Sequence, residues 1–499
     1  MQKLETIIGL EIHLQLKTKS KMFCACANDG ENQATNTTIC PICLGHPGTL
    51  PAVNQSAVKF ALNFALALNC QINQTSKFDR KNYFYPDLPK GYQISQFDQP
   101  LAVNGFVIIS HDGKQKRIGI ERLHLEEDAA KNIHQDGQTL VDFNRAGTPL
   151  AEIVSQPDFR QPEEAKIFLQ DLRLLARYLG VSEADMEKGH LRCDANISLR
   201  PIGDTKLYPK TEVKNLNSFR AVERALSYEV KRQAELWQQN AAPNFTSTRG
   251  WDENKQITIE QRRKEGSSDY RYFPEPDLPP LVISDELLAE SQNSLPELPQ
   301  AKLARLMSEF ALNFNEAEVL VKNKDWADYF ERVLSELAVW FEQKVKNNPE
   351  EAWEQNKAKL AKLTCAWLTS EVFKLLPNDF KFSDLKITPE NMAEFLSLIY
   401  DHTINSSAGQ TMLAQMFKTG DDPSHLLEKL DLGQIDDLAT LEDLVIKVFM
   451  LYPEQLAELK NGKEPLLKFF VGKVMAESKG KANPQKIEEI IKNKIKYFL

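Results

Sequence analysis

The stretch 119–158 constrains the fold more than any other, because it begins with the strict alternation of a β-strand whose two faces differ. Arg122, His124 and Glu126 share one face, and two leucines occupy the other. The apolar face can pack on a core. The polar face combines a guanidinium, an imidazole and a carboxylate, which are costly to bury unless a ligand or a metal neutralises them. The pattern predicts a sheet with one functional face.

Two distant segments repeat this alternation. One places Glu11 and His13 opposite apolar residues, and the other does the same with Arg192 and Asp194. An ordinary solvated face of an antiparallel sheet would explain any one of these strands. Solvated faces are rich in Lys, Thr and Ser, however, whereas these three faces carry Glu, His, Asp and Arg but no Lys. The recurrence therefore favours a polar cavity shared by three strands.

Composition limits the class of protein. The chain has 499 residues, of which 42% are apolar and 26% charged, as in soluble globular proteins of two to four domains. It shows neither a signal peptide nor a membrane span, which predicts a cytoplasmic protein without membrane contact. A net charge of −9 argues against indiscriminate nucleic-acid binding. Residues 461–499 hold nine Lys against four Glu, which suits either a solvated helical face or a phosphate backbone.

Four of the seven cysteines form two close pairs, CxC followed by CPIC, and the other three are isolated. The paired residues are Cys24 and Cys26, and Cys40 and Cys43. Two such pairs fit tetrahedral thiolate coordination of zinc, with free thiols as the alternative. Four sulfur ligands would close the site to substrate, so this zinc would be structural. The isolated cysteines are interpreted as small buried apolar residues.

The segment 78–100 is dense in aromatic residues, Pro and Gly, which excludes a regular helix or a central strand. Its cations and rings would suit an anionic, planar ligand, whereas the alternative is a surface loop pinned to the core by its aromatic residues. A second segment rich in Pro and aromatic residues spans 267–280. The candidate ligand-binding residues of the first segment are Arg80, Lys81, Tyr83, Lys90 and Tyr92.

The loop 142–149 and the apolar run after it add further candidates. Gly and Pro give the loop turn chemistry, so that Asn144 and Arg145 are free to reach a ligand. Glu152 interrupts the apolar run at a position where a strand core is expected. Its carboxylate either faces the edge of the sheet or binds a ligand, and the residues near it favour ligand binding.

Helical periodicity predicts helices over 51–70, 162–180 and 218–240. After about residue 293 helical periodicity dominates, which predicts an α+β fold with an antiparallel sheet followed by helices. The predicted parts are a catalytic domain at 1–293 with a zinc-binding insertion at 24–43, a helical domain at 294–385, and a helical tail at 386–499.

Long blocks of the sequence resemble the GatB family, which forms one of the subunits of aspartyl/glutamyl-tRNA amidotransferases. They include IGLEIHLQLKTKSKMF, HLEEDAAK, DFNRAGTPLAEIVS, LRCDANISLR and VGKVMAESKGKANP, and the resemblance runs nearly end to end. It implies a glutamine-synthetase-like catalytic domain that holds ATP and magnesium on the concave face of its sheet. It also implies a YqeY-like tail that binds tRNA, and a heterotrimer with an amidase subunit, GatA, and a small subunit, GatC.

The implied enzyme is a ligase that forms a carbon–nitrogen bond with glutamine as amido donor. A carboxylate does not react with ammonia at neutral pH, because its leaving group would be oxide. We therefore hypothesise that ATP phosphorylates the side-chain carboxylate of Glu on tRNA(Gln), of Asp on tRNA(Asn), or of both. Ammonia from the partner glutaminase then displaces the phosphate.

Magnesium would bridge the phosphates, and it prefers hard oxygen ligands. Carboxylates that converge without a cation would repel one another. The candidate magnesium ligands and catalytic residues are Glu11, His13, Glu126, Glu152 and Asp194. The candidate ATP- and substrate-binding residues are Arg80, Lys81, Tyr83, Lys90, Tyr92, Asn144, Arg145 and Arg192.

Neither GxxxxGK[ST] nor GxGxxG occurs in the sequence, which excludes a P-loop or a Rossmann site at the level of motifs. Two other functions compete with the amidotransferase. One is a noncatalytic, zinc-stapled RNA-binding protein, and the other is an ATP-dependent ligase acting on a small acid. Neither explains why three polar-faced strands occur together with a basic tail.

Overall fold

The N-terminal part of the chain is built on a nine-stranded sheet that is antiparallel, apart from the parallel pair β12–β13, over the residues that the structure describes. The structure is a computed structural model that describes residues 3–264, 269–344, 348–435, 437–478 and 480–495. The strands, in spatial order, are β14 (Ile257–Lys264), β13 (Thr246–Asp252), β12 (Thr211–Leu216), β11 (Leu191–Pro201), β1 (Leu4–Gln15), β10 (Pro149–Ser155), β7 (Lys114–Glu127), β6 (Ala102–His111) and β2 (Gln71–Ile72). The prediction of an antiparallel sheet is confirmed.

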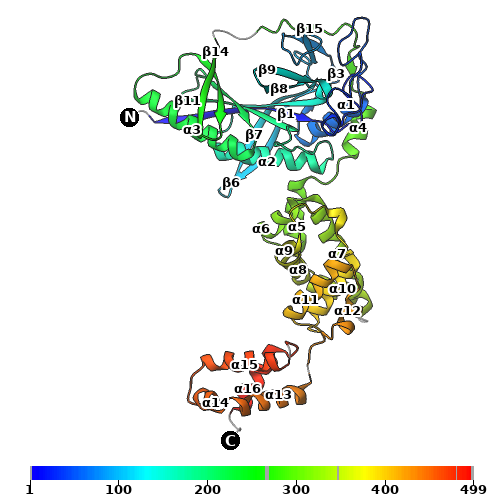
Figure 1. The fold of residues 1–499 in the computed structure, drawn as a ribbon, viewed down its shortest axis with the longest axis vertical. Coiled ribbons are helices and arrows are strands. Elements are labelled where there is room, and N and C mark those ends of the chain that lie inside the picture. The colour runs from blue at the N-terminus through cyan, green and yellow to red at the C-terminus, as the bar shows by residue number, and fades with distance from the viewer. Residues whose placement is uncertain (1–2, 265–268, 345–347, 436, 479, 496–499) are drawn as a thin grey trace. The chain divides into compact units, whose positions relative to one another are not determined.

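Three helices pack on one face of this sheet: α1 (Gln55–Ala67), α2 (Pro162–Tyr178) and α3 (Phe219–Gln238). Figure 1 shows α2 and α3 lying together against the strands. Their N-termini follow capping rules, since the side chains of Asn54 and Ser218 accept hydrogen bonds from the first turns of α1 and α3. The apolar residues of the central strands, such as Ile12, Leu125 and Ile153, are fully buried in the core beneath the helices. The polar positions of the same strands therefore point to the opposite face.

The two aromatic segments predicted from the sequence meet in a separate three-stranded sheet. It has the order β15 (Phe273–Pro274), β4 (Asp79–Asn82) and β5 (Tyr92–Ser95). The exclusion of a regular helix from 78–100 is confirmed. The exclusion of a central strand is wrong, because β4 pairs with β15 on one side and with β5 on the other in this small sheet. Ser267 and Ser268, at the start of the second segment, lie outside the described residues.

The remaining elements of this part are short. They are the strand pair β3 (Thr75–Ser76) and β16 (Leu281–Val282), the hairpin β8 (Lys131–Gln135) and β9 (Gln138–Asp142), the 3₁₀ turns Gly30–Asn32 and Phe143–Arg145, and helix α4 (Asp285–Asn293). The turn at 143–145 connects the hairpin to β10, so it lies directly before the strand that carries Glu152.

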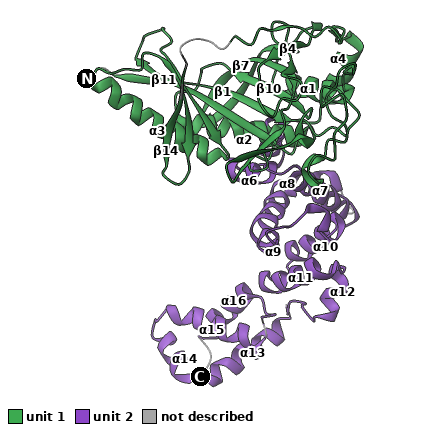
Figure 2. Ribbon diagram, turned by 45° about the horizontal axis from the view of Figure 1, so that its top comes forward, with its two compact units in different colours: residues 1–299 green, residues 300–499 purple. Residues whose placement is uncertain are grey.

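The chain divides into two compact units, Met1–Pro299 and Gln300–Leu499 (Figure 2). Helices dominate the described residues of the second unit, as predicted, and an isolated β-bridge joins Ile435 to Ala482. Its α-helices are α5 (Pro299–Phe310), α6 (Phe314–Val321), α7 (Lys324–Lys344), α8 (Pro349–Ala366), α9 (Phe373–Leu375), α10 (Pro389–Tyr400), α11 (Ser406–Thr419), α12 (Pro423–Lys429), α13 (Leu438–Leu451), α14 (Pro453–Lys460), α15 (Pro465–Glu477) and α16 (Pro484–Lys494). A π-helical turn at Trp367–Val372 joins α8 to α9, and a 3₁₀ turn spans Phe382–Asp384.

Within the second unit, α10 packs against α7, and the Tyr329 hydroxyl donates a hydrogen bond to the Ile387 carbonyl oxygen (3.1 Å). Helices α13–α16 enclose a separate apolar core around Phe449, Phe470 and Ile491. The boundary between the helical domain and the tail at 385/386 remains a prediction. None of the described helices combines the length and apolarity needed to cross a lipid bilayer.

Candidate active site

Four neighbouring strands bring one row of polar side chains together on the face of the large sheet that the helices leave free. The register pairs His13 of β1 with Arg192 of β11 on one side and with Glu152 of β10 on the other. Glu152 in turn pairs with His124 of β7. Because paired residues project from the same face, these four side chains lie side by side.

Glu152 and Glu126 lie between the two imidazoles. Nε2 of His13 is 3.4 Å from Oε2 of Glu152 and 3.5 Å from Oε1 of Glu126. Nε2 of His124 is 3.2 Å from Oε2 of Glu152. One ligand atom from each of Glu11, His13 and Glu152 lies within 4.8 Å of the others, and the same holds for His124, Glu126 and Glu152. The two glutamates are almost fully buried, so this is a compact cluster of acids and imidazoles.

Burial and the neighbouring charges shift the pKa values of three residues in this cluster. Burial raises the pKa of Glu11, and the nearby charge of Glu152 raises it further. Burial alone would lower the pKa of His13, but the hydrogen bond and charge of Glu152, together with Glu126, raise it to about 9. Burial opposes ionisation of Glu152, yet His124 and His13 hold its pKa well below its usual range. Positive charge therefore favours the ionised form of Glu152, whereas burial and the charge of Glu152 disfavour the ionised form of Glu11.

The cluster lies in a cleft of about 1000 Å³ that also contains cations. These cations are Lys81, Arg122, Arg192, Lys210 and Lys214. Burial lowers the pKa of Lys81, but the charges of Glu126, Tyr272 and Glu152 together outweigh this effect and raise the pKa. Cations beside a carboxylate cluster suit a ligand that carries phosphates and a divalent metal.

An aromatic wall lines the same cleft and comes from both aromatic segments. Phe97 and Tyr272 stack with ring centroids 4.2 Å apart and an interplanar angle of 6°. Tyr270 packs edge to face against Tyr83, and Nζ of Lys81 lies 5.3 Å from the centroid of Tyr270. Flat rings next to cations fit a ligand with both a planar base and phosphates.

A buried carboxylate in the lining of the cleft, that of Asp128, holds two arginines. Its Oδ2 accepts a 2.8 Å hydrogen bond from Nη2 of Arg192 and a 3.1 Å bond from Nε2 of Gln15. Nε of Arg145 is 3.7 Å from the same oxygen. Burial would raise the pKa of Asp128, but Arg192 and Arg145 hold it below its usual value. Asp128 thus fixes the position of Arg192 at the wall of the cleft.

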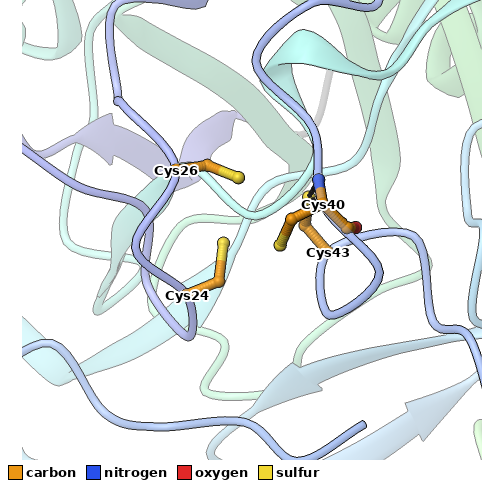
Figure 3. A group of neighbouring side chains, drawn as sticks. All are labelled: Cys24, Cys26, Cys40 and Cys43. Carbon is orange, nitrogen blue, oxygen red and sulfur yellow. Dashed lines mark hydrogen bonds between the residues drawn. The ribbon is translucent and has the colours of Figure 1, made fainter.

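The four paired cysteines converge, as the sequence predicts, and their sulfur atoms lie within 4.8 Å of one another. Figure 3 shows the four side chains turned toward a common space. The hydrogen bond from Cys24 lowers the pKa of Cys43 to about 5, against the effect of burial. Soft thiolates in this arrangement fit a zinc ion. The three isolated cysteines are buried, as predicted.

Comparison with known proteins identifies the family. Residues 6–289 match the model of the GatB/GatE catalytic domain, and residues 350–495 match that of the GatB domain. The chain is 44% identical over 501 residues to the B subunit of the aspartyl/glutamyl-tRNA(Asn/Gln) amidotransferase from Carboxydothermus hydrogenoformans, covering 99% of both chains. It is 46% identical over 494 residues to the protein of that name from Brevibacillus brevis, covering 98% of both chains.

The protein of the same name from Thermotoga maritima is 45% identical over 492 residues, which cover 97% of this chain and 98% of that one. The chain belongs to the GatB family. The resemblance read from its sequence motifs is confirmed, and the acidic cluster lies within the part that matches the GatB/GatE catalytic domain.

In this GatB-family chain the cleft brings together many of the side chains predicted from the sequence. Those that line it are Glu11, His13, Glu126, Glu152, Asp194, Lys81, Tyr83 and Arg192. Asp194 stands opposite Glu11 in the register, but its Oδ2 is 2.5 Å from Nζ of Lys214. Asp194 therefore has a cation as its immediate partner, and its magnesium role stays a prediction.

The other five predicted binding residues lie outside the lining of this cleft. Arg80 forms a bidentate pair with Glu275 (2.7 and 2.8 Å) and stacks on Tyr92. Lys90 pairs with Glu127. Their roles in ATP or substrate binding stay predictions.

The last two of these five stabilise loops behind the cleft. Asn144 accepts hydrogen bonds from the backbone N–H groups of Thr37 and Thr38 (2.8 and 2.9 Å), which holds the cysteine insertion against the turn at 143–145. Arg145 donates to the carbonyl oxygens of Ala129 and Ala130, behind the strand that carries Glu126.

Several residues of the site are missing from the set chosen from the sequence. His124 shares the polar face of its strand with Glu126. The alternation of polar and apolar residues along this strand could have identified His124 as a site residue. Asp128 follows the acidic run at the end of the same strand, but only the fold places it beside Arg192. Tyr270 and Tyr272 come from the second aromatic segment, which reaches the cleft through pairing of β15 with β4.

Proposed function

We propose that this chain is the B subunit of a tRNA-dependent amidotransferase, a ligase that converts Glu on tRNA(Gln), Asp on tRNA(Asn), or both, to the amides. Two observations support this proposal together. The chain matches relatives of that name over nearly its full length, and it gathers carboxylates, imidazoles and cations in one cleft. ATP serves as the phosphoryl donor, and ammonia displaces the phosphate from the activated carboxylate.

The acidic cluster fits magnesium, because ionised carboxylates that converge on one space need a cation to offset their repulsion. Glu11, His13, Glu126 and Glu152 would hold the metal, with His124 beside them. When bound, magnesium offsets the charge that develops on the phosphates. Glu126 and Glu152 are buried and held by their imidazole neighbours, so they present oxygen ligands in fixed positions.

The cations and rings of the cleft would orient the two substrates. Lys81 lies near the acidic cluster and beside Tyr270, so it reaches phosphate oxygens next to a stacking surface. Arg192 is held at the cleft by Asp128 and would offset negative charge on a bound phosphate. The rings of Phe97 and Tyr272 offer a flat face to an adenine base.

The word subunit in the relatives' names supports assembly into a multi-subunit enzyme. We propose an amidase partner, GatA, as the source of ammonia and GatC as a small partner. The catalytic domain spans 1–293, the helical domain 294–385 and the tRNA-binding tail 386–499. The four cysteines bind a structural zinc, because their convergent sulfur atoms match its preferred donors.

Replacing Glu126 by Gln tests the reaction and the site together. The experiment compares wild type and Glu126→Gln, each assembled with the amidase partners, in the conversion of labelled Glu on tRNA(Gln) with ATP and magnesium. We expect ATP turnover and amidation to fall by about 100-fold or more in the variant, because a buried metal ligand loses its charge. Binding of the charged tRNA should be unchanged.

The exposed Glu187→Gln is the matched control and should keep wild-type activity. Amidation by Glu126→Gln at the wild-type rate would place the metal elsewhere. A wild-type enzyme that binds the tRNA but never turns over ATP would favour a noncatalytic RNA-binding protein. ATP turnover without aminoacyl-tRNA would favour a small-molecule ligase.

Asp128→Asn should weaken the reaction without removing a metal ligand. Asn cannot hold both arginines by charge, so Arg192 loses a charge-assisted hydrogen bond worth about 1.5–3 kcal/mol. That energy corresponds to a loss of about 10- to 100-fold in kcat/KM. Steady-state kinetics with varied ATP and varied tRNA will measure it, with Asp136→Asn at an exposed hairpin tip as control. Unchanged kcat/KM in Asp128→Asn would show that Arg192 needs no support from Asp128.

A further inference from the structure

Lys21 is a fully buried lysine next to the cysteine cluster. Its side chain has 0% exposure. Its Nζ lies 3.9 Å from Sγ of Cys43 and 3.5 Å from the carbonyl oxygen of Phe143. Among the residues that the structure describes, none of the carboxylates forms an ion pair with it. A buried ammonium group without an anion is strongly unfavourable, so the thiolate of Cys43 is the group that can balance its charge.

The cysteine cluster has the complementary excess of negative charge. Four thiolates outnumber the two positive charges of a zinc ion, so the loaded cluster is anionic. The backbone N–H of Cys40 donates a 3.2 Å hydrogen bond to Sγ of Cys43, which offsets part of that charge. Lys21 reaches the same sulfur atom from the protein interior. The backbone N–H of Cys40 and the buried ammonium group of Lys21 therefore both lie next to Sγ of Cys43.

The same lysine joins the cluster to the loop that carries Arg145. Its side chain packs against Gly147, where an added Cβ would lie 3.5 Å from both Cδ of Lys21 and Cβ of Cys43. The backbone N–H of the following residue, Met22, donates to the Gly147 carbonyl oxygen (2.7 Å). The Gly147 N–H in turn donates to the carbonyl oxygen of Asp128 (2.9 Å). The contacts form a continuous path from the cysteine cluster to the backbone of Asp128, a residue that lines the cleft.

We propose that Lys21 is the buried counter-charge of the cysteine-bound metal and, through Phe143 and Gly147, a positioning residue for the loop at 143–148. The anion at position 43 and the cation at position 21 stabilise each other. Loss of either destabilises the cluster and loosens the loop. This inference rests on the structural zinc proposed above, but it does not depend on the amidation reaction.

Zinc affinity tests the charge pairing directly. Full-length wild type, Lys21→Met and Lys19→Met are titrated with a chromogenic zinc chelator; Lys19 is exposed and serves as the matched control for a lost charge. We expect the zinc affinity of Lys21→Met to fall by about 10- to 100-fold, as for other residues that support a metal ligand, and that of Lys19→Met to match wild type. Equal affinity in wild type and Lys21→Met would overturn the inference. A wild type that binds no zinc would instead contradict the zinc proposal itself.

Substitution at position 43 tests the pairing without any metal. In a background with Cys24, Cys26 and Cys40 replaced by Ser, the chain carries either Cys43→Asp or Cys43→Ser. The Asp variant retains an anion beside Lys21, so we expect its Tm to exceed that of the Ser variant by about 5 °C or more. Addition of Lys21→Met to both should remove the difference. Equal thermal behaviour of the Asp and Ser variants would overturn the proposed charge pairing.

Hydrogen exchange tests the link to the loop. In Lys21→Met the amides at 143–148 should exchange faster than in wild type, and in Lys19→Met at the wild-type rate. Exchange in Lys21→Met at the wild-type rate would restrict the role of Lys21 to the metal cluster and refute its positioning role.

Discussion

Glu152→Gln should reduce kcat for amidation by about 1000-fold, which is the largest effect on activity that we expect of a single substitution. Glu152 belongs to both groups of potential metal ligands and touches both imidazoles, at 3.4 Å from His13 and 3.2 Å from His124. Gln retains the shape of the side chain but removes the charge that attracts the metal and orients the two rings. Single-turnover kinetics of ATP cleavage on charged tRNA would separate this loss from tRNA binding.

Glu187→Gln is again the control, because it removes an equal charge from an exposed position. A fold that is intact by circular dichroism and a wild-type Kd for the tRNA should accompany the loss in Glu152→Gln. If Glu152→Gln retains wild-type ATP cleavage, the row of paired side chains across β11, β1, β10 and β7 does not hold the metal. The magnesium site proposed here would then be wrong.

Glu229→Gln should have the largest effect on stability, lowering the free energy of unfolding by about 3–5 kcal/mol. Glu229 lies on α3 with 0% exposure and accepts hydrogen bonds from Nη2 of Arg232 (2.7 Å) and Nε2 of Gln233 (3.1 Å). Nε of Arg249 is 3.3 Å from the same carboxylate. Neutralising Glu229 leaves two half-buried guanidinium groups without their shared anion. Urea unfolding monitored by fluorescence would measure the change.

The pH dependence of this effect has a definite sign. Burial opposes ionisation of Glu229, but the charge and hydrogen bond of Arg232, together with hydrogen bonds from Thr258 and Gln233, hold the pKa of Glu229 below its usual value. A lowered pKa in the folded state contributes stability above the ordinary carboxyl pKa of about 4.3, and this contribution is lost as pH falls through the folded pKa. The difference between wild type and Glu229→Gln should therefore be constant from pH 7 to about pH 5 and shrink below that.

Glu235→Gln, on an exposed position of the same helix, should leave stability within about 0.5 kcal/mol of wild type. A difference between wild type and Glu229→Gln that persists unchanged into strong acid would mean that the charge of Glu229 contributes nothing. The loss would then come from packing alone.

Features that depend on nearby residues could be predicted from the sequence. Alternation separated the polar faces of Glu11, His13 and Glu126 from the core, because the two-residue period of a strand is local. Helix ends followed capping residues such as Ser218. The spacing of the cysteines predicted their convergence. Long blocks of motifs identified the family.

Features that depend on residues far apart in the chain were decided by the tertiary structure. The register of β1 with β10, and of β10 with β7, decided that His13, Glu152 and His124 form one row. Alternation cannot determine this, since a strand can pair at many offsets without changing its own pattern.

The partners of single side chains likewise emerged only from the fold. Lys21 resembles any other lysine in the sequence, yet it is buried beside Cys43. Asp194 was predicted as a metal ligand on the strength of its strand, whereas its nearest partner, Lys214, comes from the next strand of the sheet. The sequence by itself determined which faces are polar and which family the chain belongs to. The tertiary structure decided which charges meet, because Coulombic partners depend on distances that local periodicity does not determine.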